Sequence, residues 1–203
     1  SISIGGKDIR DYSTKALMNT VAFVFQDTYI FAESVYDNIA MHQNVTQEAV
    51  EYAAKAARCH DFIQALPEGY HTKLGDGGHK LSGGEAQRIA IARAILKNAP
   101  IVVLDEAMAF ADAENELALR EGMAELLKGK TVLMIAHRLY SIQDADMIFV
   151  LENGRLKESG THKDLLQKHG LYAHLWDIQN ETESWRMKGG TAHVSDNPAI
   201  HLP

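Results

Sequence analysis

Two adjacent acids, Asp105 and Glu106, stand directly after an apolar run that reads Ile-Val-Val-Leu. A buried carboxylate without a partner is costly, so such a run must carry its acids to the edge of a sheet. In open parallel sheets the ligand crevice lies at this edge, at the carboxyl ends of the strands. Neighbouring strand residues point in opposite directions, which favours separate roles: Asp105 on a hydrated Mg²⁺ and Glu106 on an attacking water. Taken alone, the pair fits equally well with a turn aspartate followed by a solvated glutamate.

A serine and two glycines, Ser82, Gly83 and Gly84, precede Glu85 and a long helix-forming stretch. Ser82 and Glu85 have the spacing of a capping box, which is a purely structural interpretation. That interpretation leaves the glycines unexplained, because each glycine costs a helix about 1 kcal/mol relative to alanine. Glycines let a ligand approach the backbone closely, and the free N–H groups of a helix N-terminus attract phosphate. The pattern favours an anion site over a simple cap.

Gln26 and His137 each follow an apolar run that we expect to form a strand. If the strand before His137 lies beside the strand before Asp105, His137 reaches the same crevice. The amide of Gln26 is suited to binding Mg²⁺ or to orienting a water. Taken singly, a histidine after a strand is more often structural, and a glutamine there is usually a turn residue. Their interest comes from sharing an edge with Glu106.

Short apolar runs and helix-forming stretches alternate along the chain, and they must position these side chains. The near-continuous apolar run 21–25 predicts a strand buried on both faces, and further strands are expected at 1–6, 101–104 and 131–136. Asn153-Gly154 predicts a tight turn between strands at 147–151 and 155–158. Helical patterns occupy the ranges 11–19, 45–59, 85–97, 114–127, 163–169 and 171–178. We expect a glycine-rich loop at 67–80 and a loose polar tail at 181–203.

Strands that alternate with helices predict an α/β fold, a mostly parallel sheet with helices on its faces. The helix-rich stretch between Gln26 and Gly84 interrupts the alternation and predicts an inserted helical subdomain. The net charge of -7 argues against a nucleic-acid-binding surface, which needs a basic patch. A single cysteine, Cys59, excludes an internal disulfide and a cysteine metal cluster. Because no apolar run approaches the roughly 20 residues of a membrane helix, a membrane connection is expected to come through a partner or further sequence.

Together these residues resemble the ATP-hydrolysing domain of ABC transporters. Residues 81–88 (LSGGEAQR) resemble the signature sequence of that family, and residues 104–107 (LDEA) resemble its Walker B motif. Gln26-Asp27 is similar to the Q-loop and residues 136–138 (AHR) to the switch histidine, with order and spacing in agreement up to about Ile178. Residues 72–78 (TKLGDGG) resemble the loop before the signature in exporter-fold transporters. The resemblance implies a P-loop NTPase-like, RecA-like fold.

The resemblance also implies ATP and Mg²⁺ as ligands and gives each candidate a role. Glu106 would polarise the attacking water, His137 would hold the γ-phosphate, and Gln26 would act beside them. Asp105 and Gln26 would surround the metal ion. Nucleotide contacts are implied for Ser82, Gly83, Gly84, Gln87 and Asp112. The signature residues among these would contact ATP held by a second domain.

Two partners are therefore expected. The first is a second nucleotide-binding domain, identical or different, arranged head to tail with this one. The second is a transmembrane domain whose coupling helices would fit a groove lined by residues 26–39. We expect no nucleic-acid partner. The function implied is that of an ATPase of the translocase class, which powers substrate movement across a membrane from the cytoplasmic face of the cell membrane.

The sequence departs from the family pattern in two places. Residues 108–112 read MAFAD where the family has TSALD, so Asp112 is kept but Ala109 lacks the hydroxyl that would hydrogen-bond across the dimer. This variant is similar to exporter-fold transporters that import iron-siderophores. The second departure is larger: no Gly-Lys-Ser/Thr loop, the Walker A motif, occurs within the 203 residues. We therefore expect an ATPase core truncated at its N-terminal part, and no activity from residues 1–203 alone.

These expectations divide the chain into four parts. Residues 1–25 are expected to be a partial ATPase core, and residues 26–84 to hold the Q-loop, the helical subdomain and the signature. Residues 85–180 would complete the core with Walker B and the switch histidine, followed by the tail 181–203. Two rival functions stay open, a soluble ABC ATPase that acts on ribosomes or DNA and a non-catalytic regulatory remnant.

Overall fold

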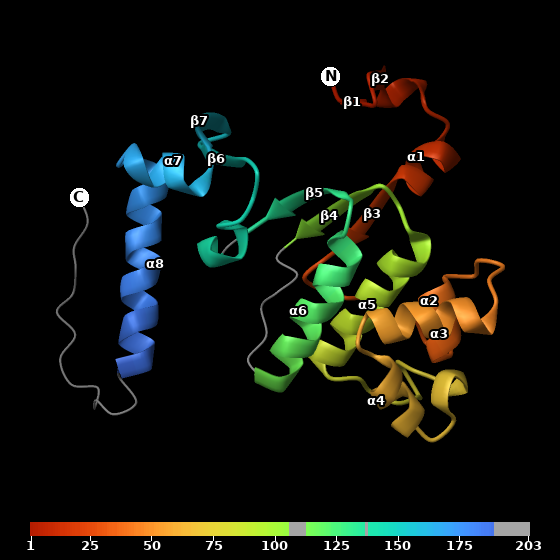
Figure 1. Ribbon diagram of the computed structural model, residues 1–203. Helices are drawn as coiled ribbons and strands as arrows, with labels where there is room; N and C mark the ends of the chain where they lie inside the picture. The colour runs from red at the N-terminus through yellow and green to blue at the C-terminus, as the bar shows by residue number, and fades with distance from the viewer. Residues whose placement is uncertain (106–112, 137, 189–203) are drawn as a thin grey trace. The chain divides into compact units, whose positions relative to one another are not determined.

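The computed structural model describes residues 1–105, 113–136 and 138–188, with the side chains of 113–115 and 182–188 left out (Figure 1). Glu106, Asp112 and His137 lie outside the described residues. The chain forms two compact units, Ser1–Ile135 and Ala136–Pro203.

The first unit is built on a three-stranded parallel sheet with strand order β3-β4-β5. Its strands are β3 (Val21–Val24), β4 (Ile101–Asp105) and β5 (Thr131–Ile135). Val24 lies opposite Leu104, and Asp105 lies opposite Ile135. All three strands run in the same direction, so their carboxyl ends meet at one edge. The predicted α/β class is confirmed, and the strand Thr131–Ile135 lies beside the strand that carries Asp105.

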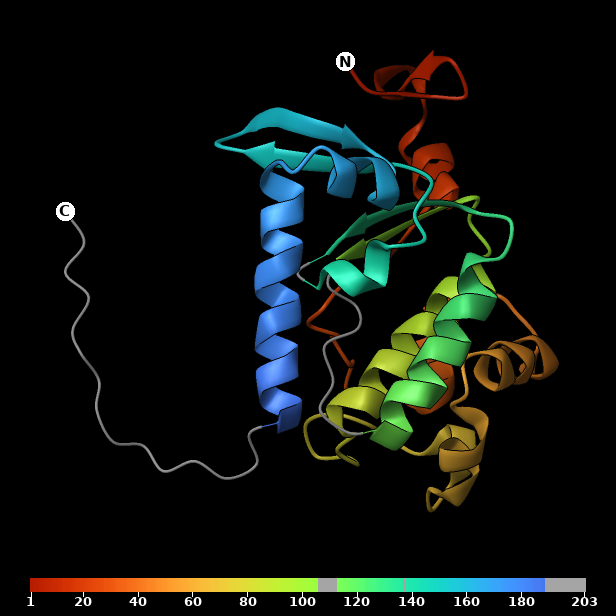
Figure 2. The same cartoon turned by 60° about the vertical axis from the view of Figure 1, so that its left-hand side comes forward.

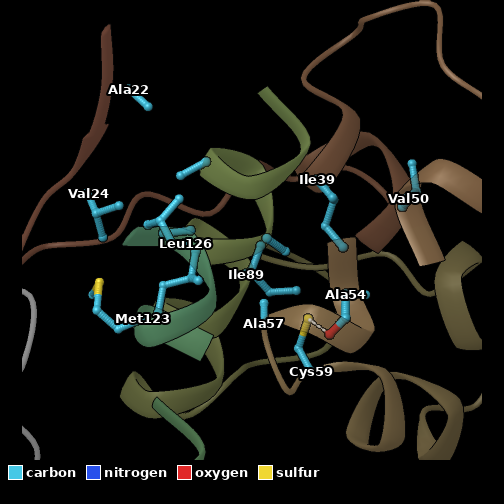
Figure 3. Packing of buried hydrophobic residues seen from close by; sticks show 14 of the residues in the cluster. Ala22, Val24, Ile39, Val50, Ala54, Ala57, Cys59, Ile89, Met123 and Leu126 are labelled. Carbon is cyan, nitrogen blue, oxygen red and sulfur yellow. Dashed lines mark hydrogen bonds between the residues drawn. The ribbon is translucent and has the colours of Figure 1, made fainter. Parts of the chain in front are cut away.

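Helices α5 (Gly83–Lys97) and α6 (Ala113–Leu127) supply the packing for one face of this sheet. Val24 and Leu104 are buried in that core, whereas the alternate residues Phe23 and Leu133 are 48% and 59% exposed. The prediction that the strand at 21–25 is buried on both faces is therefore wrong for the described residues. Apolar residues occupy both faces of the strand, but the core of this unit, drawn in part in Figure 3, receives only every second one.

The helical subdomain packs against α5 and consists of α2 (Val35–Ala40), α3 (Gln47–Ala56), α4 (His60–Ala65) and the 3₁₀ turn η2 (Gly69–His71). The hydroxyls of Ser34 and Thr46 cap α2 and α3 by accepting from Asp37 N and Ala49 N. These caps explain why the helices begin where they do. Figures 1 and 2 show α2, α3 and α4 grouped on one side of α5. The predicted subdomain is thus present between Gln26 and Gly84.

Cys59 precedes α4 and is fully buried in the core, with Ala54 and Ala57 drawn near it in Figure 3. Its thiol donates to the carbonyl of Ala54 at 3.3 Å. Burial raises the pKa of the Cys59 thiol to about 12, which keeps the group protonated at neutral pH. The residue therefore behaves as a small hydrophobic side chain.

At the start of the chain, β1 (Ser3–Ile4) and β2 (Lys7–Asp8) form a small antiparallel hairpin around Gly5-Gly6. A 3₁₀ turn, η1 (Ile9–Asp11), leads to helix α1 (Thr14–Thr20). The hydroxyl of Ser13 accepts from Ala16 N, so α1 begins after this cap and not at the predicted residue 11.

The second unit contains η3 (Leu139–Ile142), β6 (Ile148–Glu152), β7 (Arg155–Gly160), α7 (His162–Gln167) and α8 (Leu171–Lys188). Strands β6 and β7 form the predicted hairpin, and both turn residues, Asn153 and Gly154, have positive φ angles of 49° and 73°. The carboxylate of Glu158 accepts from Leu171 N and Tyr172 N, which satisfies the start of α8.

Helix α8 also corrects a prediction. The loose tail was expected from residue 181, but the helix continues to Lys188. The stretch 181–188 (ETESWRMK) contains no glycine or proline, so nothing in it stops a helix that has already begun. Residues 189–203 lie outside the described part of the chain.

Replacing Ile89 by alanine tests the core of the first unit. Ile89 lies on α5, is fully buried, and is labelled in Figure 3. The change should lower the free energy of unfolding by about 2–5 kcal/mol, because it leaves a cavity. The control is Ile2→Ala at a site that is 64% exposed, where the change should stay within about 0.5 kcal/mol. Urea unfolding followed by far-UV circular dichroism measures both, and equal shifts would contradict the assigned core.

Candidate functional site

Asp105 and Gln26 lie at the carboxyl edge of the parallel sheet. Asp105 is the last residue of β4 and is half-buried, while Gln26 follows β3 and is exposed. The register pairs Val24 with Leu104, so strands β3 and β4 end side by side at this edge. A carboxylate and an amide oxygen are the hard ligands that Mg²⁺ prefers, and the pair therefore fits this ion. No group of three or more His, Cys, Asp or Glu side chains suited to a metal was found within the described ranges.

The N-terminus of α5 carries the predicted capping box. Glu85 N donates to the Ser82 hydroxyl at 3.3 Å, and Ser82 N donates to the Glu85 carboxylate at 2.8 Å. The structural interpretation of Ser82 and Glu85 is therefore confirmed. The N–H groups of Gly83 and Gly84 belong to the first turn, where helix N–H groups have no partner within the helix.

The same box affects any anion that approaches this turn. The Glu85 carboxylate already interacts with the positive end of the helix dipole. An arriving phosphate must be placed beside this negative charge, so it depends on the close backbone approach that Gly83 allows. Gly83 is exposed and Gly84 is buried, which leaves Gly83 as the more accessible of the two. The nucleotide contacts predicted for Ser82, Gly83 and Gly84 stay predictions.

Gln87 lies one turn into α5 and is only 1% exposed. The side-chain oxygen of Gln87 accepts from the Thr28 hydroxyl at 3.3 Å, and its side-chain nitrogen donates to Phe25 O at 3.4 Å. These contacts hold the residues on both sides of Gln26-Asp27. The sequence suggested only a nucleotide contact for Gln87, which stays a prediction. Its role in holding the loop was missed.

Lys97, at the end of α5, makes a comparable contact with the start of β3. Its ammonium donates to Val21 O at 2.8 Å, and partial burial lowers the pKa of Lys97. The sequence signal for such contacts is a long polar side chain among the apolar residues of the helix, as at Gln87, Arg93 and Lys97.

Three predicted site residues, Glu106, Asp112 and His137, cannot be compared with the structure because they lie outside its described residues. The described strands show where their neighbours lie. Asp105 precedes Glu106 and pairs with Ile135 on β5. The roles of these three residues stay predictions from the sequence. Among the described helices, none is both long and apolar enough for a membrane span.

Comparison with known proteins identifies relatives of this chain. Residues 1–109 match the sequence profile of the family described as ABC transporter. The chain is 48% identical over 178 residues to YgaD of Bacillus subtilis (strain 168), which is named as a candidate multidrug export ATP-binding/permease protein. It is 47% identical over 180 residues to a protein of Staphylococcus aureus (strain NCTC 8325 / PS 47) with the same descriptive name. These alignments cover 87% and 88% of this chain but only 31% of each relative.

A solved structure is also similar. The chain matches a bacterial Atm1-family ABC exporter with ATP bound, with a TM-score of 0.78 and 43% identity. This match covers 86% of the chain and 31% of the exporter. The likeness confirms the predicted P-loop NTPase-like fold.

The capping box yields a test of its own. Ser82→Ala removes the hydroxyl that accepts from Glu85 N, so the free energy of unfolding should fall by about 1 kcal/mol. Ser82→Thr keeps an accepting hydroxyl and serves as the control, with a smaller loss. Urea unfolding followed by circular dichroism measures both variants. If Ser82→Ala leaves the urea midpoint unchanged, the box contributes nothing measurable to stability.

Proposed function

Since this chain belongs to the ABC transporter family, we propose that it is the ATP-binding and ATP-hydrolysing domain of a membrane transporter. The observation that supports this most is the parallel register of β3 and β4, which brings Gln26 and Asp105 to one edge of the sheet. Walker B and the Q-loop of the family resemblance thus start from adjacent strand ends. The names of the relatives favour export as the direction of transport.

The site residues divide the chemistry between them. Asp105 and Gln26 bind Mg²⁺, which when bound neutralises charge on the phosphates of ATP. Glu106 polarises the attacking water, and His137 contacts the γ-phosphate. The backbone at Gly83 and Gly84, with Ser82, Gln87 and Asp112, completes the contacts with nucleotide. Because helix α5 begins at Gly83, its N-terminal N–H groups are the natural donors to phosphate.

Two partners follow from this proposal. The signature turn at Ser82 and Gly83 faces ATP held by a second nucleotide-binding domain. The side chain of Tyr29, which is 71% exposed, suits the groove proposed over residues 26–39 that receives helices of a transmembrane domain at the cytoplasmic face of the membrane. A soluble ATPase that acts on nucleic acid is disfavoured by the net charge of -7.

Glu106→Gln tests the catalytic assignment in the complete transporter. The change keeps the shape of the side chain and removes the charge that activates water, so steady-state ATP hydrolysis should fall at least 100-fold, on the order of a general-base contribution. Binding of ATP should persist, because the phosphate and metal ligands remain. The matched control is Glu121→Gln, at a side chain on α6 that is 47% exposed. Near-normal turnover by Glu106→Gln would rule out Glu106 as the base.

Residues 1–203 by themselves should not hydrolyse ATP. In P-loop ATPases the Walker A backbone and lysine hold the β- and γ-phosphates, and the Walker A Ser/Thr helps to hold Mg²⁺. No such loop occurs within these residues, and the signature turn faces the nucleotide of the other domain. Phosphate release with Mg²⁺ and ATP should equal that of Glu106→Gln in the same chain. A clear excess over that control would mean that these residues bind the triphosphate in another way.

A further inference from the structure

Arg93 lies in the second half of α5 and reaches across to the segment that follows the Q-loop. Its Nη1 donates to Tyr29 O at 2.7 Å, and its Nη2 donates to the side-chain oxygen of Asn38 at 2.7 Å. Its Nε donates to the backbone carbonyl of Asn38. The guanidinium also lies over the ring of Phe31, 5.6 Å from the centroid. One side chain therefore connects α5 to the segment 29–31 and to α2.

Asn38 extends this network into the loop before α2. It is fully buried, and its amide nitrogen donates to Phe31 O and Ser34 O, both at 3.0 Å. Its side-chain oxygen accepts from Phe31 N at 2.9 Å as well as from Arg93. The loop 29–34 is therefore held by Asn38 at Phe31 and Ser34 and by Arg93 at Tyr29.

The chemistry of these contacts indicates what Arg93 supplies. Each of the oxygens that it contacts here is neutral, a backbone carbonyl or an amide. Burial lowers the pKa of Arg93 to about 10, so the group stays charged at neutral pH at a cost in desolvation. An apolar side chain would fill the same space without that cost. What only a guanidinium provides is a rigid fork of donors that fixes several acceptors at once.

Arg93 and Gln87 hold two ends of one short segment. They are six positions apart on α5, about 9 Å along the helix axis. Gln87 contacts Phe25 and Thr28, and Arg93 contacts Tyr29. Gln26 lies between these fixed points and is itself exposed. Its position thus depends on how firmly its neighbours are held to α5.

We propose that Arg93 is a positioning residue for the ATPase reaction: with Asn38 it fixes the segment 29–34 on α5 and thereby places Gln26. The effect on catalysis rests on the proposed function, whereas the fixing of the segment does not. Loss of the fork leaves Asp105, the start of α5 and the contacts of Gln87 in place, and it releases the segment 29–34, so that the stretch containing Gln26 is then held to α5 by Gln87 alone. The expected result is a loss in turnover with little change in the affinity for ATP.

Hydrogen exchange on the 203-residue chain tests the fixing directly. In Arg93→Gln, exchange of the amides in 29–34 should rise at least tenfold, while exchange in β4 stays unchanged. Arg93→Lys keeps the charge but not the fork, and it should behave like Arg93→Gln. The matched control is Arg120→Gln, an arginine on α6 with a 56% exposed side chain. Exchange in 29–34 equal to this control, a uniform rise throughout the first unit, or full rescue by lysine would each overturn the proposal.

A double-mutant cycle in the complete transporter tests the route through Gln26. Arg93→Gln should lower kcat about tenfold, with the KM for ATP changed less than twofold. In a Gln26→Ala background the same change should lower kcat less than twofold, because the residue that Arg93 positions is already absent. An equal loss in both backgrounds would overturn the proposed route. If the wild-type transporter shows no ATP hydrolysis, the proposed function fails, and the exchange experiment still decides whether Arg93 fixes the segment.

Discussion

The attachment of helix α5 to the segment 21–38 is the constraint on which the candidate site depends. Among the described residues, the side chains of Gln87, Arg93 and Lys97 hydrogen-bond to backbone or side-chain oxygens between Val21 and Asn38. Helix α5 begins at the turn that resembles the signature, and the segment attached to it contains the residues that resemble the Q-loop. Both motifs are therefore held by the same helix. Most of these hydrogen bonds are partly buried, so breaking one leaves a donor or acceptor that water reaches only in part. The spacing between the two motifs is therefore set by α5 itself, with the parallel sheet fixing where the segment begins.

The start of α5 combines a capping box with the phosphate contact that we propose for the same turn. The box of Ser82 and Glu85 accounts for the position of the helix start, and it does so without any ligand. It does not account for Gly83 and Gly84, which weaken the first turn. Glu85 adds a negative charge there, so a phosphate gains from this turn only through close backbone contact. Glycine is the residue that permits this contact, which reconciles the two interpretations.

The parallel strands and the carboxyl-edge location of Asp105 and Gln26 are predictable from the sequence, because apolar runs are local and their alternation with helices predicts a parallel sheet. It did not predict that Phe23 and Leu133 are exposed, since a continuous apolar run does not tell which face finds a partner. The polar composition of residues 181–188 indicates a tail, but this stretch contains no helix breaker, and α8 extends to Lys188. The contacts of Arg93 join residues far apart in sequence, and no local pattern encodes them.

The choice of arginine at position 93 follows from the geometry of its acceptors. Tyr29 O and the two oxygens of Asn38 are contacted by three different nitrogens of Arg93, whereas a lysine offers a single nitrogen. Burial also lowers the pKa of a lysine from a lower starting value, so a lysine there would be closer to losing its charge. Arginine stays protonated even with its pKa lowered to about 10. The cation therefore persists in a partly buried site without a carboxylate among the contacts described, and its geometry, more than its charge, determines where the loop lies.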